Sequence, residues 1–158
     1  MNAELLEPRL MGSGPLLIAG ASERYTPQTA ARIPQLWQQF APQIGHIPGQ
    51  VGWTTYGVCL NGDDHGFEYV AGVEVEHLDD VPAGLRGLTV PAHTYAVFTH
   101  RGHVSALRST MDAIFATWLP TSNYRYAGAP ILERYGEAFD PKTGGGEIEV
   151  WLPVDARD

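Results

Sequence analysis

The sequence is poor in cysteine and lysine. Its 158 residues include one cysteine, Cys59, and one lysine, Lys142, beside nine arginines. A single cysteine excludes a disulfide within the chain. Cys59 lies in the apolar segment 55–60 with no basic residue beside it. We therefore expect a buried, unreactive thiol.

Positive charge and long apolar runs are also scarce. Acidic residues outnumber basic ones by 18 to 10, and the net charge is −8, which argues against direct nucleic-acid binding. No stretch approaches the roughly 20 apolar residues of a membrane helix. The segment Met1–Glu7 lacks the features of a signal peptide. With 44% hydrophobic residues, the sequence predicts a single cytoplasmic domain over residues 1–158 that does not contact a membrane.

Apolar and alternating segments predict strands. The clearest alternation is at 67–76, where Phe67 and Tyr69 are interleaved with Glu68. Before it, Asn61–Gly66 has the composition of a hairpin loop. The expected strands are 16–22, 53–60, 67–76, 94–99, 129–135 and 147–154.

Two segments have helical spacing. In the first, 26–41, Thr26 can cap the N-terminus. Pro34 interrupts this segment, so we expect its regular part from Ile33 onward. The second carries a stripe from Leu107 to Trp118 and ends at Pro120.

The order of these elements repeats. Each half reads as strand, helix, strand, hairpin and strand, and the overlay places Tyr56-Gly57 on Tyr135-Gly136 and Thr54 on Glu133. The sequence therefore predicts an α+β fold of duplicated strand–helix–strand–strand units. We expect a mostly antiparallel, curved sheet with two main helices on one face. A groove should lie on the pseudo-two-fold axis.

Glu133 is an acidic residue on a mostly apolar face of the predicted strand 129–135. Alternation puts it on the same face as Ile131 and Tyr135. A carboxylate on an apolar face is costly unless a cation or hydrogen-bond donors satisfy it. A salt bridge from an arginine such as Arg101 would do so. Alternatively, Glu133 anchors a pocket for a cationic ligand.

Several segments together resemble a known family. They are Tyr56-Gly57-Val58, Phe67-Glu68-Tyr69, residues 91–98, 118–124 and 132–135, and Glu149 to Val154. These residues resemble the GyrI-like small-molecule-binding domain over about residues 5–154. This is the effector-binding domain of AraC-type and multidrug-responsive regulators, and it also occurs as a stand-alone protein. The absence of a DNA-binding segment in these 158 residues fits the stand-alone form.

The resemblance implies a hydrophobic groove for lipophilic, often cationic compounds, with a buried glutamate at the position of Glu133. It implies a binding protein linked to transcription regulation or drug response, rather than an enzyme. A separate regulator is a possible protein partner. The predicted ligand-binding residues are Glu133, Tyr56, Trp118, Tyr95, Trp37 and Phe139. Ordinary core packing is the other interpretation of the tryptophans.

Two other functions stay open. Some relatives resemble hydrolases of electrophilic natural products, and Glu133 would then be the general base, with Tyr56 or Tyr95 as the donor. A gyrase-inhibitor-like interaction module is the other alternative. His100 and His103 lack a third ligand in the sequence nearby, so we predict neither a metal site nor a cofactor.

Overall fold

The computed structural model describes residues 7–157, which form two compact units. One unit comprises residues 15–91, and the other comprises residues 7–14 and 92–157. Most of the N-terminal segment considered above for targeting, residues 1–6, lies outside the described residues. No helix of the described chain has the length and apolar character needed to cross a membrane.

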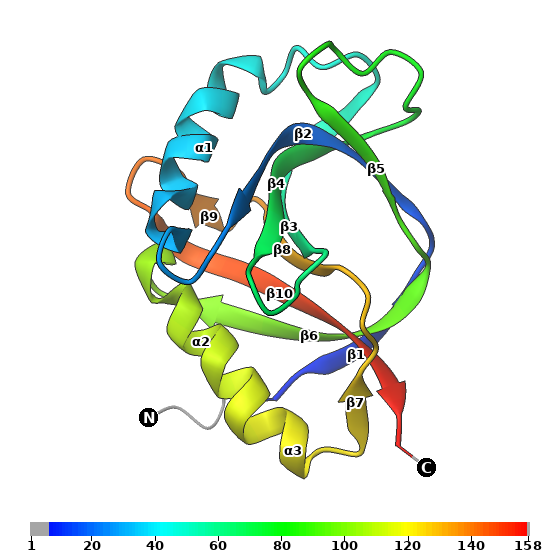
Figure 1. Cartoon of the computed structure of the whole chain (residues 1–158), viewed down its shortest axis with the longest axis vertical. Helices are drawn as coiled ribbons and strands as arrows, with labels where there is room; N and C mark the ends of the chain where they lie inside the picture. Colours follow the sequence, from blue (N-terminus) through cyan, green and yellow to red (C-terminus); the bar gives the residue numbers. More distant parts are fainter. Residues whose placement is uncertain (1–6, 158) are drawn as a thin grey trace. The chain divides into compact units, whose positions relative to one another are not determined.

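The unit of residues 15–91 contains an antiparallel sheet and one main helix (Figure 1). Its strands are ordered β3-β4-β2-β5, and each neighbouring pair is antiparallel. The elements are β2 (Leu16–Tyr25), α1 (Ile33–Phe40), β3 (Gln50–Leu60), β4 (Phe67–Val75) and β5 (Arg86–Val90), with short 3-10 turns at Ala30–Arg32 and Ala41–Gln43.

Helix α1 begins where the sequence predicts its regular part. The side chain of Thr26 accepts hydrogen bonds from the backbone N–H groups of Gln28 and Thr29, and a 3-10 turn then leads to Ile33. Pro34 therefore lies in the first turn of α1, where its missing N–H costs nothing. The helix buries Leu36 and Phe40 in an apolar cluster with residues of β2 and β4.

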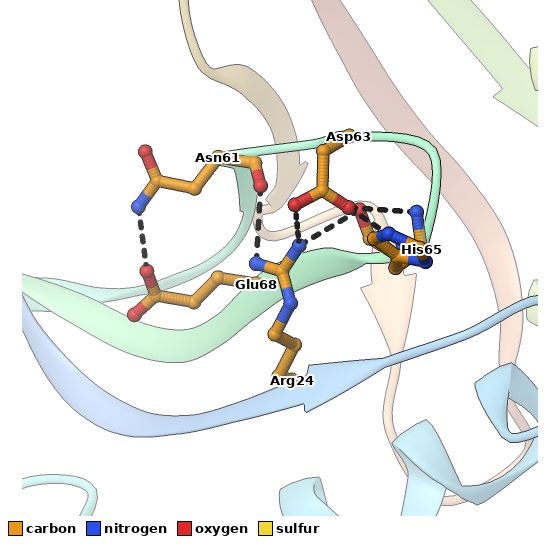
Figure 2. Close-up of polar contacts among 6 residues, drawn as sticks. Arg24, Asn61, Asp63, His65 and Glu68 are labelled. Carbon is orange, nitrogen blue, oxygen red and sulfur yellow. Dashed lines mark hydrogen bonds and ion pairs between the residues drawn. The ribbon is translucent and has the colours of Figure 1, made fainter.

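The predicted hairpin loop joins β3 to β4 (Figure 2). Asp63 accepts hydrogen bonds from the backbone N–H groups of His65 and Gly66, and its carboxylate lies 2.7 Å from the guanidinium of Arg24. The hydrogen bond from His65, the largest effect, helps to hold the pKa of Asp63 below its ordinary value. Asp63 thus closes the loop of which it is part, and its ion pair with Arg24 of β2 stabilises the loop.

The second unit carries the C-terminal half of the chain. Its strands are ordered β1-β6-β10-β8, with β7 and β9 also paired to β10. The strands are β1 (Arg9–Ser13), β6 (His93–Arg101), β7 (Tyr124–Tyr126), β8 (Ile131–Tyr135), β9 (Phe139–Asp140) and β10 (Gly145–Ala156). The helical segment consists of a 3-10 turn at Val104–Ala106, α2 (Leu107–Ala113), a π-helical turn at Ile114–Trp118 and α3 (Leu119–Thr121).

The two units have the same pairing plan, which confirms the predicted duplication and the α+β fold. In each, the strand before the helix is paired to the last strand of the repeat: β2 to β4, and β6 to β10. The last strand of the repeat also pairs with a second strand, β3 in the first unit and β8 in the second. An edge strand completes each sheet, β5 beside β2 and β1 beside β6. The predicted groove and the placement of both helices on one face stay predictions.

The second helical segment widens just before its proline. Pro120 follows the π-helical turn Ile114–Trp118, in which the N–H of Leu119 donates to the carbonyl of Ile114. Proline has no N–H and its ring clashes with the preceding turn of a regular α-helix. A wider turn relieves that clash, and such turns are frequent at functional sites.

Glu149 is the centre of a charged cluster on the second unit. Its carboxylate lies 2.7 Å from Arg9 of β1 and 3.6 Å from Arg134 of β8, and it accepts a hydrogen bond from the indole of Trp151. Burial alone would raise the pKa of Glu149, but the bonds from Arg9 and Trp151 and the two guanidinium charges outweigh it and lower the pKa. The cluster therefore joins three strands.

Close packing of β2 against β4 predicts a strict requirement for glycine at position 20. Gly20 and Gly72 are cross-strand partners, and a Cβ on Gly20 would collide with the carbonyl oxygen of Ala71 and lie 2.5 Å from Cα of Gly72. We expect Gly20→Ala to lower the free energy of unfolding by about 1–3 kcal/mol, measured by urea denaturation. Gly12→Ala is the matched control, because nothing lies within 4 Å of the added carbon. Equal effects of both changes would contradict the prediction.

The lowered pKa of Glu149 predicts an acid-dependent contribution to stability. A carboxyl group with a lower pKa in the folded state stabilises the fold above its unfolded pKa, about 4.3. It loses that contribution as the pH falls through the folded value. We therefore expect the difference in unfolding free energy between wild type and Glu149→Gln to have its largest value at pH 6. The difference should shrink as the pH falls below 4. Urea titrations at each pH measure it, and a constant difference would refute it.

Candidate ligand-binding site

Glu133 is buried on β8, and its side chain is 8% exposed. Its neighbours in alternation, Ile131 and Tyr135, are also buried, as the sequence predicts. The hydroxyl of Tyr135 donates a hydrogen bond to Oε1 of Glu133 at 2.7 Å. A hydrogen bond to a charged group is stronger than one between neutral groups, so Tyr135 stabilises and orients the carboxylate.

The strand register places Glu133 on the helix-covered face of its sheet. Glu133 is opposite Val150 of β10, and Val150 is opposite Phe98 of β6. Side chains that are directly opposite each other across antiparallel strands point to the same face. The ring of Trp118, from the helical segment, packs edge-on against Phe98 with centroids 5.0 Å apart. Glu133 therefore shares its face with Phe98 and with the helix that carries Trp118.

Two groups of aromatic rings are linked to this face. The ring of Phe139 is 4.9 Å from that of Tyr135, the residue bonded to Glu133. Trp118 is stacked on Tyr124, with centroids 6.3 Å apart and planes 12° apart. Phe139 thus contacts the tyrosine that is bonded to Glu133, and Trp118 contacts Phe98. Their part in ligand binding stays a prediction.

Tyr95 lies on the opposite face. It is three residues from Phe98 on β6, and an odd separation along a strand reverses the face. Its ring is 5.5 Å from that of Trp151, it is 1% exposed, and burial raises the pKa of its phenol. Tyr95 therefore packs against Trp151, on the other face from Glu133, and its part in ligand binding stays a prediction.

The two remaining predicted residues belong to the unit of residues 15–91. Tyr56 is buried on β3. Trp37 is half-buried on α1, and its indole N–H donates to the hydroxyl of Tyr69 at 3.1 Å. Their part in ligand binding stays a prediction.

The arginine suggested as a partner for Glu133 has another partner. Nε of Arg101 lies 3.1 Å from Oε2 of Glu147, its cross-strand neighbour. Arg101 is an odd number of residues from Phe98, so it projects from the other face of β6. The hypothesis that Arg101 neutralises Glu133 is therefore wrong.

Sequence reasoning missed the contacts of Tyr135 with Glu133 and of Tyr124 with Trp118. The alternation at 131–135 already placed Tyr135 beside Glu133, and the two-residue spacing could have identified the phenol as a donor to the carboxylate. No comparable signal exists for Tyr124. It meets Trp118 across the turn that follows α3, and sequence periodicity does not describe such turns.

The histidines of the segment 100–103 make hydrogen bonds that stabilise the fold. His100 is 3% exposed, with Nδ1 2.7 Å from the hydroxyl of Thr110 and Nε2 2.9 Å from the carbonyl of His103. These contacts join β6 to α2. Within residues 7–157, no group of three histidine, cysteine, aspartate or glutamate side chains is arranged to hold a metal ion.

Comparison with known proteins identifies the family of this chain. The family model of the GyrI-like small-molecule-binding domain matches residues 7–155. The transcriptional regulator BrlR of Pseudomonas aeruginosa is 32% identical over 124 residues, which are 77% of this chain and 46% of BrlR. The chain thus matches just under half the length of that regulator.

Two solved structures share the fold. SAV2435 bound to tetraphenylphosphonium superposes with a TM-score of 0.75 at 22% identity, covering 94% of each chain. EcmrR, in its complex with DNA, gives a TM-score of 0.69 at 15% identity over 94% of this chain and 57% of EcmrR. With its family model matched over nearly the whole length, this chain belongs to the GyrI-like small-molecule-binding domain family.

Proposed function

We propose that this protein binds amphipathic, cationic small molecules, and that the carboxylate of Glu133 anchors their positive charge. The observation that carries the proposal is the burial of this carboxylate on a face that also carries Phe98 and Trp118. Its hydrogen bond from Tyr135 fixes one oxygen. The site would thus present a held negative charge between aromatic rings.

The physical chemistry of such a site favours organic cations. Burying a carboxylate is costly, and attraction between opposite charges is several times stronger near a protein interior than in water. A lipophilic cation loses little hydration on entering such a site. Aromatic rings near the charge add cation–π attraction of about 0.5–2 kcal/mol each.

The comparisons support the same ligand class. SAV2435 shares the fold and has been solved with tetraphenylphosphonium, a permanent cation with four phenyl groups. BrlR and EcmrR point to a regulatory setting. We infer that this chain reports the presence of such compounds to transcription through a separate regulator, and that it does not itself bind DNA.

A hydrolase is the second candidate, and one contact favours it. A carboxylate with a phenol 2.7 Å away is a pair that can move a proton in general acid–base catalysis. Tyr135 takes the donor role suggested from the sequence for Tyr56 or Tyr95. Steady consumption of an alkylating electrophile by wild type, abolished in Glu133→Gln, would move the assignment from binding to hydrolysis.

Cation binding is tested with two ions of the same shape and opposite charge. We expect tetraphenylphosphonium to bind in isothermal titration calorimetry and to raise Tm. Tetraphenylborate should do neither, because its negative charge is repelled by the carboxylate. Glu133→Gln should weaken phosphonium binding at least tenfold, the equivalent of about 1.4 kcal/mol.

The matched control for this experiment is Glu137→Gln. Glu137 is exposed and follows the last residue of β8, Tyr135, by two positions. Glu137→Gln therefore removes one negative charge, as Glu133→Gln does, without altering the candidate site. Equal losses in the two variants would indicate a general surface-charge effect. Binding of both ions by wild type, or of neither, would refute the proposal.

The hydrogen bond from Tyr135 predicts a coupled pair. We expect Tyr135→Phe to lower the free energy of unfolding by about 1–3 kcal/mol, because a buried charged acceptor loses its donor. In the Glu133→Gln background, where the acceptor is neutral, the same change should cost less. A double-mutant cycle from urea denaturation measures the coupling, and additive effects would show that the bond contributes nothing specific to the charged form.

A further inference from the structure

The last described residue, Arg157, reaches back to the turn that follows the helical segment. Its Nε donates to the carbonyl of Tyr124 at 2.7 Å, and its Nη2 donates to the carbonyl of Leu119 at 3.1 Å. Its backbone N–H donates to the carbonyl of Asn123 at 2.9 Å. One residue thus holds three carbonyl groups of a six-residue stretch.

These contacts add to those of Ser122 in closing the turn between α3 and β7. The hydroxyl of Ser122 donates to the carbonyls of Leu119, at 2.9 Å, and Tyr124, at 3.2 Å, and its backbone N–H donates to Leu119 at 3.2 Å. The carbonyls in the last turn of a helix have no partner within the helix, and the negative end of the helix dipole favours a cation there. Arg157 supplies both a donor and a charge at Leu119. On the other side, Ala156 of β10 is opposite Tyr124 of β7, so Arg157 extends the β7–β10 pairing to the helix end.

The turn carries the aromatic wall of the candidate site at its two ends. Trp118 comes directly before Leu119, and Tyr124 comes directly after Asn123. Their rings are stacked, with planes 12° apart, and Trp118 also packs on Phe98. Both Trp118 and Tyr124 are half-buried, which leaves ring surface accessible. The conformation of the turn therefore determines how Tyr124 lies against Trp118.

We propose that Arg157 is a positioning residue for this wall: by closing the turn, it holds Tyr124 on Trp118 and so sets the affinity for the aromatic body of a cation bound at Glu133. This inference rests on the proposed function. It adds a determinant of specificity at the C-terminal end of the chain, with no contact between Arg157 and the ligand's charge. The effect of replacing Arg157 should therefore depend on whether the substituents of the cation are aromatic or aliphatic.

Two cations with equal charge and different substituents test this dependence. Tetraphenylphosphonium has aromatic arms, and tetrabutylphosphonium has aliphatic ones. We expect Arg157→Ala to weaken the phenyl compound by about three- to tenfold, the factor for one well-placed aromatic contact. Binding of the butyl compound should change less than twofold. Arg108→Ala, which removes an exposed arginine from α2 of the same unit, should change neither.

A structural effect on the whole site would weaken both cations equally and would overturn the proposal, as would unchanged affinity for both. Arg157→Lys keeps the charge but loses the two-pronged geometry, so its affinity for the phenyl compound should lie between wild type and Arg157→Ala. This second variant also decides the question if Arg157→Ala does not fold.

A measurement without ligand tests the positioning separately. Protein labelled with 5-fluorotryptophan gives a ¹⁹F resonance for each of its four tryptophans, and Trp118→Phe identifies that of Trp118. In Arg157→Ala we expect this resonance to shift or broaden while those of Trp37 and Trp53 stay in place. An unmoved Trp118 resonance overturns the inference. If wild type binds neither cation, the proposed function and the affinity effect both fail, and a moved Trp118 resonance would uphold only the positioning.

Discussion

The second unit depends on one constraint, the simultaneous pairing of β10 with β6 and β8. Val150, at its centre, is fully buried and is opposite both Phe98 and Glu133. Because opposite side chains share a face, this register puts the carboxylate on the face that meets the helix. A slip of one residue would send Glu133 to the other face. Backbone pairing therefore determines the face on which Glu133 lies.

The sequence predicted well where polarity alternates or turn chemistry is strong. The charged residue at 133 on an apolar face identified the buried carboxylate, and Asn61–Gly66 identified the β3–β4 loop. It did not predict which face of β6 carries Tyr95, because residues 95–98 are apolar at every position and all are at most 2% exposed. A strand buried on both faces has no alternation from which its inward side could be predicted.

Long-range contacts of irregular segments could not be predicted for a different reason. Arg157 meets Leu119 and Tyr124 across 38 and 33 positions of sequence, and its targets are backbone carbonyls, which every residue possesses. Nothing in the side-chain pattern marks them. The stacking of Tyr124 on Trp118 follows from the path of the turn after Pro120. The helical periodicity that revealed Trp118 ends at that proline.

The two units share a pairing plan but differ in what their interiors contain. Among the described residues, the buried polar or charged side chains are His100, Thr110 and Glu133, all from the second unit. His100 and Thr110 satisfy each other: in the neutral ring, Nε2 must donate to the carbonyl of His103, so Nδ1 accepts from the hydroxyl of Thr110.

Glu133 differs from that pair because it is acidic. A neutral glutamine could accept the same hydrogen bond from Tyr135. Thr54, the position that the sequence repeat lays on Glu133, has a neutral side chain in the first unit. The buried acidic side chain is thus found in one of the two duplicated units. The proposed recognition of a cation would use the charge itself.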